Sequence, residues 1–154
     1  MKYAATFGYR VWLRPEESHL ARGWIAHDGE IAMRLGLATI PAAAETIAID
    51  TILTLARATG ARIHLARLST HEGVARVREA KRSDMEITCD VSINHLHLCD
   101  VDIGWFNPNC RLIPPLRGVR DRDALRAGLG DGTIDAICPD HTSVDADTET
   151  LTIP

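Results

Sequence analysis

The stretch RIHLARLSTHE, residues 62–72, contains the pattern that decides the fold. Its first part, 62–68, is an apolar run that predicts a buried strand. A helix start follows, because Ser69 as N-cap and Glu72 three residues later form a capping box. One residue interrupts this simple pattern. Arg67 places a permanent cation at the end of the predicted strand.

The same alternation of a short β-rich run and a helical pattern recurs along the chain. In the strongest helical pattern, 41–59, Pro41 suits the first turn and Gly60 is a natural C-cap. Asp121 is the expected cap of the last helix, 121–129. Alternating strands and helices predict βαβ units, and so an α/β domain with a mostly parallel sheet spanning residues 1–154. Strands are expected at 9–13, 62–68, 86–93 and 134–140, and helices at 41–59, from 69 through the following GVARVREAKR segment, and at 121–129.

Polar residues stand where each predicted strand ends. In parallel α/β folds, functional side chains gather at the carboxyl ends of the strands. We therefore expect Arg14, Arg67, Asp90 and Asp140 to lie at one end of the sheet.

The composition excludes several other function classes. A formal charge of −4 gives no support to nucleic-acid binding, which usually requires a basic face. No apolar run approaches the length that spans a membrane, and no signal-peptide pattern opens the sequence. The four cysteines form no CxxC pair, so we interpret them as reduced thiols of a cytoplasmic protein.

Four quoted segments resemble a dihydroorotase of the amidohydrolase superfamily. They are LRPEE (13–17), RLGLATIPAAAE (34–45), HLARLST (64–70), and PPLR (114–117) followed by DRDALRAGLGDGTIDAICPDH (121–141). They resemble the middle to late part of a family member, whose fold is a (β/α)8 TIM barrel. The resemblance implies that this chain forms about the last four β/α units, a half barrel of parallel strands.

The resemblance also implies a chemistry. Active family members interconvert carbamoyl aspartate and dihydroorotate in pyrimidine biosynthesis, with zinc at the strand ends. Carried over residue by residue, two of the zinc-ligand histidines fall on Arg14 and Arg67, and the last ligand, also the general acid/base position, falls on Asp140. Two substrate-side positions are changed as well, to Ile113 and Val144.

Arginine cannot replace a histidine as a zinc ligand. Its guanidinium offers no lone pair, stays protonated and presents only donors. No metal cofactor is therefore expected, and Asp140 is predicted to be inactive. We hypothesise that Arg14, Arg67 or both form an ion pair with Asp140 and supply the positive charge that the metal supplies in relatives.

Three functional interpretations remain open. The first is a non-catalytic dihydroorotase-like protein, similar to subunits that assemble with aspartate carbamoyltransferase. The second is a zinc-dependent dihydroorotase that takes its missing ligands from elsewhere. The third is a truncated fragment, which is compatible with the first. A half barrel exposes two sheet edges and one sheet face, so a second copy of the chain is the other expected partner.

Simpler alternatives accompany these interpretations. Arg14 and Arg67 could be ordinary surface arginines whose alignment is accidental. His95, His97 and Cys99 lie on one face of a predicted extended run and could hold a metal of their own. His64 alternates to the opposite strand face from Arg67 and is expected to be a core residue.

Overall fold

A four-stranded parallel sheet forms the centre of the computed structural model, which describes residues 1–23 and 25–141. The strand order is β1-β4-β5-β6, so each new strand of this sheet is added beside the previous one. This confirms the predicted α/β class with parallel strands. The strands are β1 (Arg10–Leu13), β4 (Arg62–Leu65), β5 (Ile87–Ser92) and β6 (Ala136–Cys138).

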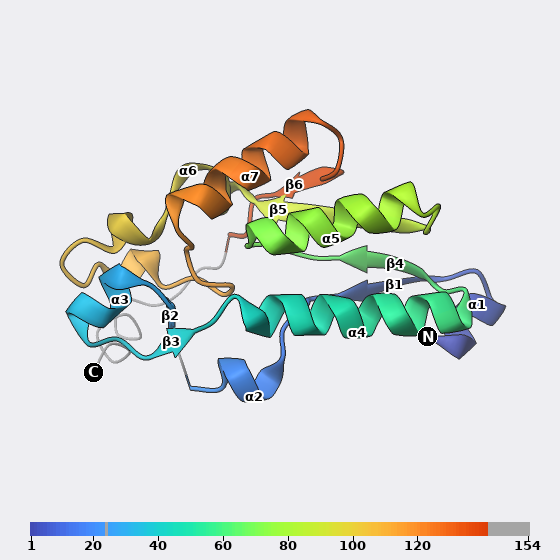
Figure 1. Cartoon of the computed structure of the whole chain (residues 1–154), viewed down its shortest axis with the longest axis horizontal. Coiled ribbons are helices and arrows are strands. Elements are labelled where there is room, and N and C mark those ends of the chain that lie inside the picture. Colours follow the sequence, from blue (N-terminus) through green and yellow to red (C-terminus); the bar gives the residue numbers. More distant parts are fainter. Residues whose placement is uncertain (24, 142–154) are drawn as a thin grey trace.

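Three helices cover one face of this sheet: α4 (Ala43–Thr59), α5 (His71–Arg82) and α7 (Val119–Gly130). Figure 1 shows them on the same side of the strands. Successive strand residues point to opposite faces, so only every second side chain reaches these helices. The buried core lies between the two layers and includes Ile49, Leu53, Ile63, Leu65, Val74, Val77, Ile87, Cys89, Val91 and Leu125.

The ends of the predicted helices differ in detail from the structure. Helix α4 ends at Gly60, whose φ of 66° is the left-handed conformation expected of a glycine C-cap. It begins at Ala43, so Pro41 stands just before the helix and not in its first turn.

The predicted caps of the next two helices are wrong. Thr70, not Ser69, is the N-cap of α5, and its side chain accepts from the amide of Gly73. Ser69 is held by Glu45, a contact that a local capping pattern does not reveal. Gly118, not Asp121, is the N-cap of α7.

Smaller elements gather beyond the carboxyl ends of the strands (Figure 1). A short parallel pair, β2 (Ala26–His27) with β3 (Thr39–Ile40), was not predicted. The apolar residues Ile103, Cys110 and Leu116 form a second, small core there. The others are α2 (Ser18–Ala21), α3 (Glu30–Leu35), α6 (Ile93–His97), η1 (Asp100–Ile103) and η2 (Pro108–Cys110). Helix α1 (Lys2–Thr6), in contrast, lies at the opposite end of the sheet (Figure 1).

Among the described residues, no helix combines the length and the apolar character that crossing a bilayer requires.

Candidate functional site

Arg67 and Asp140 meet at the carboxyl ends of the strands. The guanidinium Nη1 of Arg67 donates to Oδ1 of Asp140 at 2.7 Å. The side chain of Asp140 is 11% exposed and that of Arg67 is 31% exposed, so the pair is partly shielded from water. Both residues have left-handed backbones, with φ of 60° and 51°. Side-chain residues rarely adopt this region, which marks both positions as locally strained.

A second carboxylate, Asp90 in β5, joins Arg67 to a histidine. The amide of Arg67 donates to Asp90 Oδ1 at 2.7 Å, and Nε2 of His64 lies 2.9 Å from Asp90 Oδ2. The other ring nitrogen of His64 lies 2.8 Å from Thr88 Oγ1, and the ring of Trp12 stacks on the imidazole at 4.1 Å between centroids. His64 is buried, as predicted.

Cys138 lies beside these carboxylates at the end of β6. Burial and, to a smaller extent, the negative charges of Asp90 and Asp140 together raise the pKa of its thiol to about 11. The thiol is therefore protonated near neutral pH. It is neither a nucleophile nor a thiolate ligand under those conditions.

The donor set at the strand ends does not fit zinc. A zinc ligand needs a free lone pair on imidazole, thiolate or carboxylate. Arg67 has none, and its guanidinium occupies the carboxylate of Asp140. The imidazole of His64 has both nitrogens engaged, and Cys138 is a neutral thiol. We therefore assign no metal-dependent step to these residues.

Arg14, the other predicted partner of Asp140, makes a different ion pair. The ion pair of Arg14 joins it to Glu16, at 3.1 Å between Nη2 and Oε1, and not to Asp140. Ile113 is 47% exposed and directly precedes the PPLR segment. Val144 lies outside the described residues.

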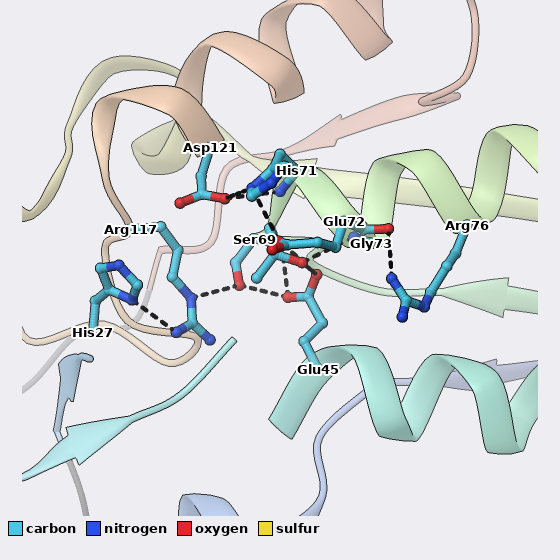
Figure 2. A network of polar contacts seen from close by, with 10 residues as sticks. His27, Glu45, Ser69, His71, Glu72, Gly73, Arg76, Arg117 and Asp121 are labelled. Atoms are coloured by element: carbon cyan, nitrogen blue, oxygen red, sulfur yellow. Dashed lines mark hydrogen bonds and ion pairs between the residues drawn. The ribbon is translucent and has the colours of Figure 1, made fainter. Parts of the chain in front are cut away.

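A buried network next to the strand ends connects three segments that are distant in sequence (Figure 2). Glu45, near the start of α4, is 3% exposed and accepts four hydrogen bonds. The donors are the amides and hydroxyls of Ser69 and Thr70. Because every donor belongs to the turn between β4 and α5, this carboxylate fixes the segment that carries Arg67.

Arg117, the last residue of PPLR, extends that network. It is 3% exposed, and it donates from Nε to Ser69 Oγ and from Nη1 to the carbonyl of Ile40. Its Nη1 also lies 3.2 Å from Nδ1 of His27. Burial lowers the pKa of Arg117, while the charge of Glu45 opposes that shift. The PPLR segment is thereby tied to β3 and to the turn between β4 and α5, and through Ser69 to Glu45 in α4.

His71, Glu72 and Asp121 bring three possible ligand atoms within 4.8 Å of one another. Nδ1 of His71 lies 2.8 Å from Asp121 Oδ1 and 3.0 Å from Glu72 Oε2, and its amide also donates to Asp121. The cluster stands at the first turns of α5 and α7, where the helix dipoles are positive. That environment favours the carboxylates and opposes a cation, so we interpret the cluster as a clamp between helices (Figure 2).

The alternative metal site in the INHLHLC segment requires an extended backbone. The expected extended backbone is wrong, because part of this segment is helical. His95 and His97 belong to helix α6, where residues two apart point in different directions. Nε2 of His95 is hydrogen-bonded to the carbonyl of Pro115, and Sγ of Cys99 contacts Asp102. Within the described ranges these three residues form no common ligand group.

Comparisons with known proteins place this geometry in a wider context. No protein-family model matches the sequence. A dihydroorotase from Bacillus caldolyticus is 44% identical over 141 residues, which cover 92% of this chain and 33% of the relative. The chain thus spans about a third of the length of the curated relatives it matches. The sequence similarity supports the predicted resemblance, while the non-catalytic subtype stays a prediction.

Solved structures show the same fold. The chain matches an L-hydantoinase from Arthrobacter aurescens with a TM-score of 0.75 and 22% identity, over 91% of this chain and 32% of that one. It matches a dihydroorotase from Campylobacter jejuni with a TM-score of 0.66 and 12% identity, over 92% and 36%. The parallel sheet therefore corresponds to part of the fold of these structures, which confirms the predicted partial TIM barrel.

Proposed function

We propose that this chain is a non-catalytic, dihydroorotase-like protein of pyrimidine biosynthesis that acts as a structural partner in the cytoplasm. The observation that carries the proposal is the ion pair between Arg67 and Asp140. The guanidinium neutralises the carboxylate where the resemblance expects a metal ion. A largely buried aspartate left without any cation would be costly, so this arginine stabilises a site that does not use zinc.

The contrast between changed site positions and an intact buried network supports the same proposal. Arg14, Arg67, Ile113 and Val144 stand at positions where the resemblance expects other residues. The buried network around Glu45, in contrast, has all its donors in place. A protein that needs its shape but not its chemistry would show this combination.

We propose the catalytic chain of aspartate carbamoyltransferase as the assembly partner, because a dihydroorotase-like scaffold with altered ligand positions resembles the non-catalytic subunits that associate with that enzyme. The test is the mass of a mixture of the two purified proteins in solution. A stable complex is expected, and elution of two separate species would contradict this partner.

One observation favours a second function. The relatives are named dihydroorotase, so a zinc-dependent cyclic amide hydrolase fits those names equally well. It would require ligands from outside this chain, since the strand-end residues described above do not fit zinc.

Zinc content and turnover together separate the two functions. The purified chain would be equilibrated with zinc, dialysed, and assayed for dihydroorotate formation from carbamoyl aspartate, alone and with the carbamoyltransferase chain. The B. caldolyticus dihydroorotase serves as the positive control. The proposal expects no zinc at Asp140 and no turnover above the uncatalysed rate. Zinc-dependent turnover that is lost in Asp140→Asn would establish the hydrolase.

A further inference from the structure

One face of the central sheet has no helical layer over it in the described part of the chain. The helices α4, α5 and α7 all pack against the opposite face (Figure 1). Trp12 stands on this open face, stacked on His64, and is 67% exposed. A tryptophan is a large apolar side chain, and exposing most of it to water is unfavourable.

Both edges of the same sheet also lack a neighbour among the described residues. β1 pairs only with β4, and β6 only with β5. Parallel strands are usually covered on both faces, and unpaired strand edges invite a further strand. On the helical side of the β6 edge, Ile137 pairs in register with buried Val91 yet is itself 45% exposed.

We propose that two copies of this chain join through these edges and close one eight-stranded parallel barrel. A two-fold axis parallel to the strands keeps all the strands parallel. It also places β6 of each copy beside β1 of the other, so both seams are made by the same pair of edges. Eight parallel strands are the number that closes a barrel filled by side chains. In that barrel the two Trp12 side chains enter the interior.

The charges of the two edges favour this second copy over an unrelated occupant. Arg14 and Asp140 are already paired within the chain, with Glu16 and Arg67. Arg10, at the start of β1, is exposed and donates to the neutral hydroxyl of Thr88. Asp135, just before β6, is also exposed, and Lys81 pairs with it. Each seam brings the cation Arg10 toward the anion Asp135, and such complementarity favours this pairing. The inference depends on the sheet and not on the ligand positions, so its failure would leave the non-catalytic function untouched.

Sedimentation of the whole chain over a range of concentrations tests the inference. The mass expected is twice 16.9 kDa. Trp12→Arg should raise the dimer dissociation constant at least about tenfold while circular dichroism stays native. Trp105→Arg is the matched control, because Trp105 is 88% exposed in a loop away from the sheet, and it should leave the dimer unchanged.

Two further measurements cover the case in which Trp12→Arg does not fold. Ile137→Lys, at the other edge, should weaken the dimer in the same way. Hydrogen exchange should show that the amides of residues 10–13 and 136–138 become protected as the dimer forms. A folded monomer at all concentrations would overturn the proposal. Binding of a different protein at this face, without any self-association of the chain, would also overturn it.

Discussion

Arg67 and Asp140 are 73 residues apart in sequence, yet the guanidinium of one contacts the carboxylate of the other at 2.7 Å across the end of β5. The pair joins the ends of two strands that are not neighbours in the sheet. It therefore stabilises the strand-end geometry as well as neutralising a charge.

The strength of this pair can be measured by a double-mutant cycle. Arg67→Met and Asp140→Asn, singly and together, would be compared by urea unfolding at one fixed protein concentration. We expect a favourable coupling energy of about 1–3 kcal/mol, because the two charges are hydrogen-bonded and partly shielded. Arg14→Met combined with Asp140→Asn is the control and should be additive, since Arg14 pairs with Glu16.

Gly73 is predicted to tolerate no side chain. A Cβ at this position would collide with Glu45 Oε1 and come within 2.9 Å of Thr70 Oγ1. Gly73→Ala should therefore lower the free energy of unfolding by about 1–3 kcal/mol. Gly130→Ala, where a Cβ meets no atom within 4 Å, is the control and should change it by no more than about 0.5 kcal/mol. Equal effects of the two changes would contradict the packing described for Glu45.

The buried carboxylate of Glu45 is predicted to require both of its oxygens. In Glu45→Gln, the amide nitrogen would face donors from either Ser69 or Thr70 and break their hydrogen bonds. We expect a loss of about 2–4 kcal/mol in thermal or urea unfolding. Glu79→Gln, at an exposed position of α5, should cost less than about 0.5 kcal/mol.

The stability of the fold is predicted to fall on mild acidification because of His95. Burial lowers the pKa of this imidazole below its ordinary value of 6.5. Nδ1 is buried without a hydrogen-bond partner, while the contact of Nε2 with the carbonyl of Pro115 partly opposes the shift. The unfolded chain binds that proton more readily. The stabilising contribution is thus fully present above pH 6.5 and is lost as the pH falls below this value.

Urea unfolding between about pH 7.5 and about pH 5.5 checks this sign, with a slope for this histidine of at most about 1.4 kcal/mol per pH unit. His95→Gln should remove that component. His27, whose pKa burial also lowers, would leave a remainder. His97→Gln, exposed on the same helix, is the control and should retain the full slope. An unchanged slope in His95→Gln would rule out this origin.

Sequence reasoning succeeded where local pattern and parallel topology suffice. The alternation of strands and helices predicted the sheet, and the rule that strand ends meet at one edge brought Arg67 and Asp140 into the same region. It failed where a residue distant in sequence determines the local structure. Serine is a common N-cap residue, but Ser69 is hydrogen-bonded to Glu45, 24 residues earlier, and Thr70 caps the helix instead.

The contact of Arg67 and His64 with one carboxylate could not be foreseen either. Strand alternation places them on opposite faces. The left-handed backbone of Arg67, with φ of 60°, ends that alternation and turns its amide toward Asp90. The helix α6 was missed for a similar reason, since an apolar run with histidines at every second position is typical of a strand.

The central claim, that a guanidinium has replaced a metal ion at Asp140, is tested most directly by anomalous X-ray scattering from crystals of the chain grown with excess zinc. Because His71, Glu72 and Asp121 could take up zinc nonspecifically, the position of each peak decides, and His71→Ala provides the matched control. The account predicts no peak at Asp140, with the Arg67 guanidinium still on its carboxylate. A fully occupied zinc bound to Asp140, with Arg67 displaced, would contradict it.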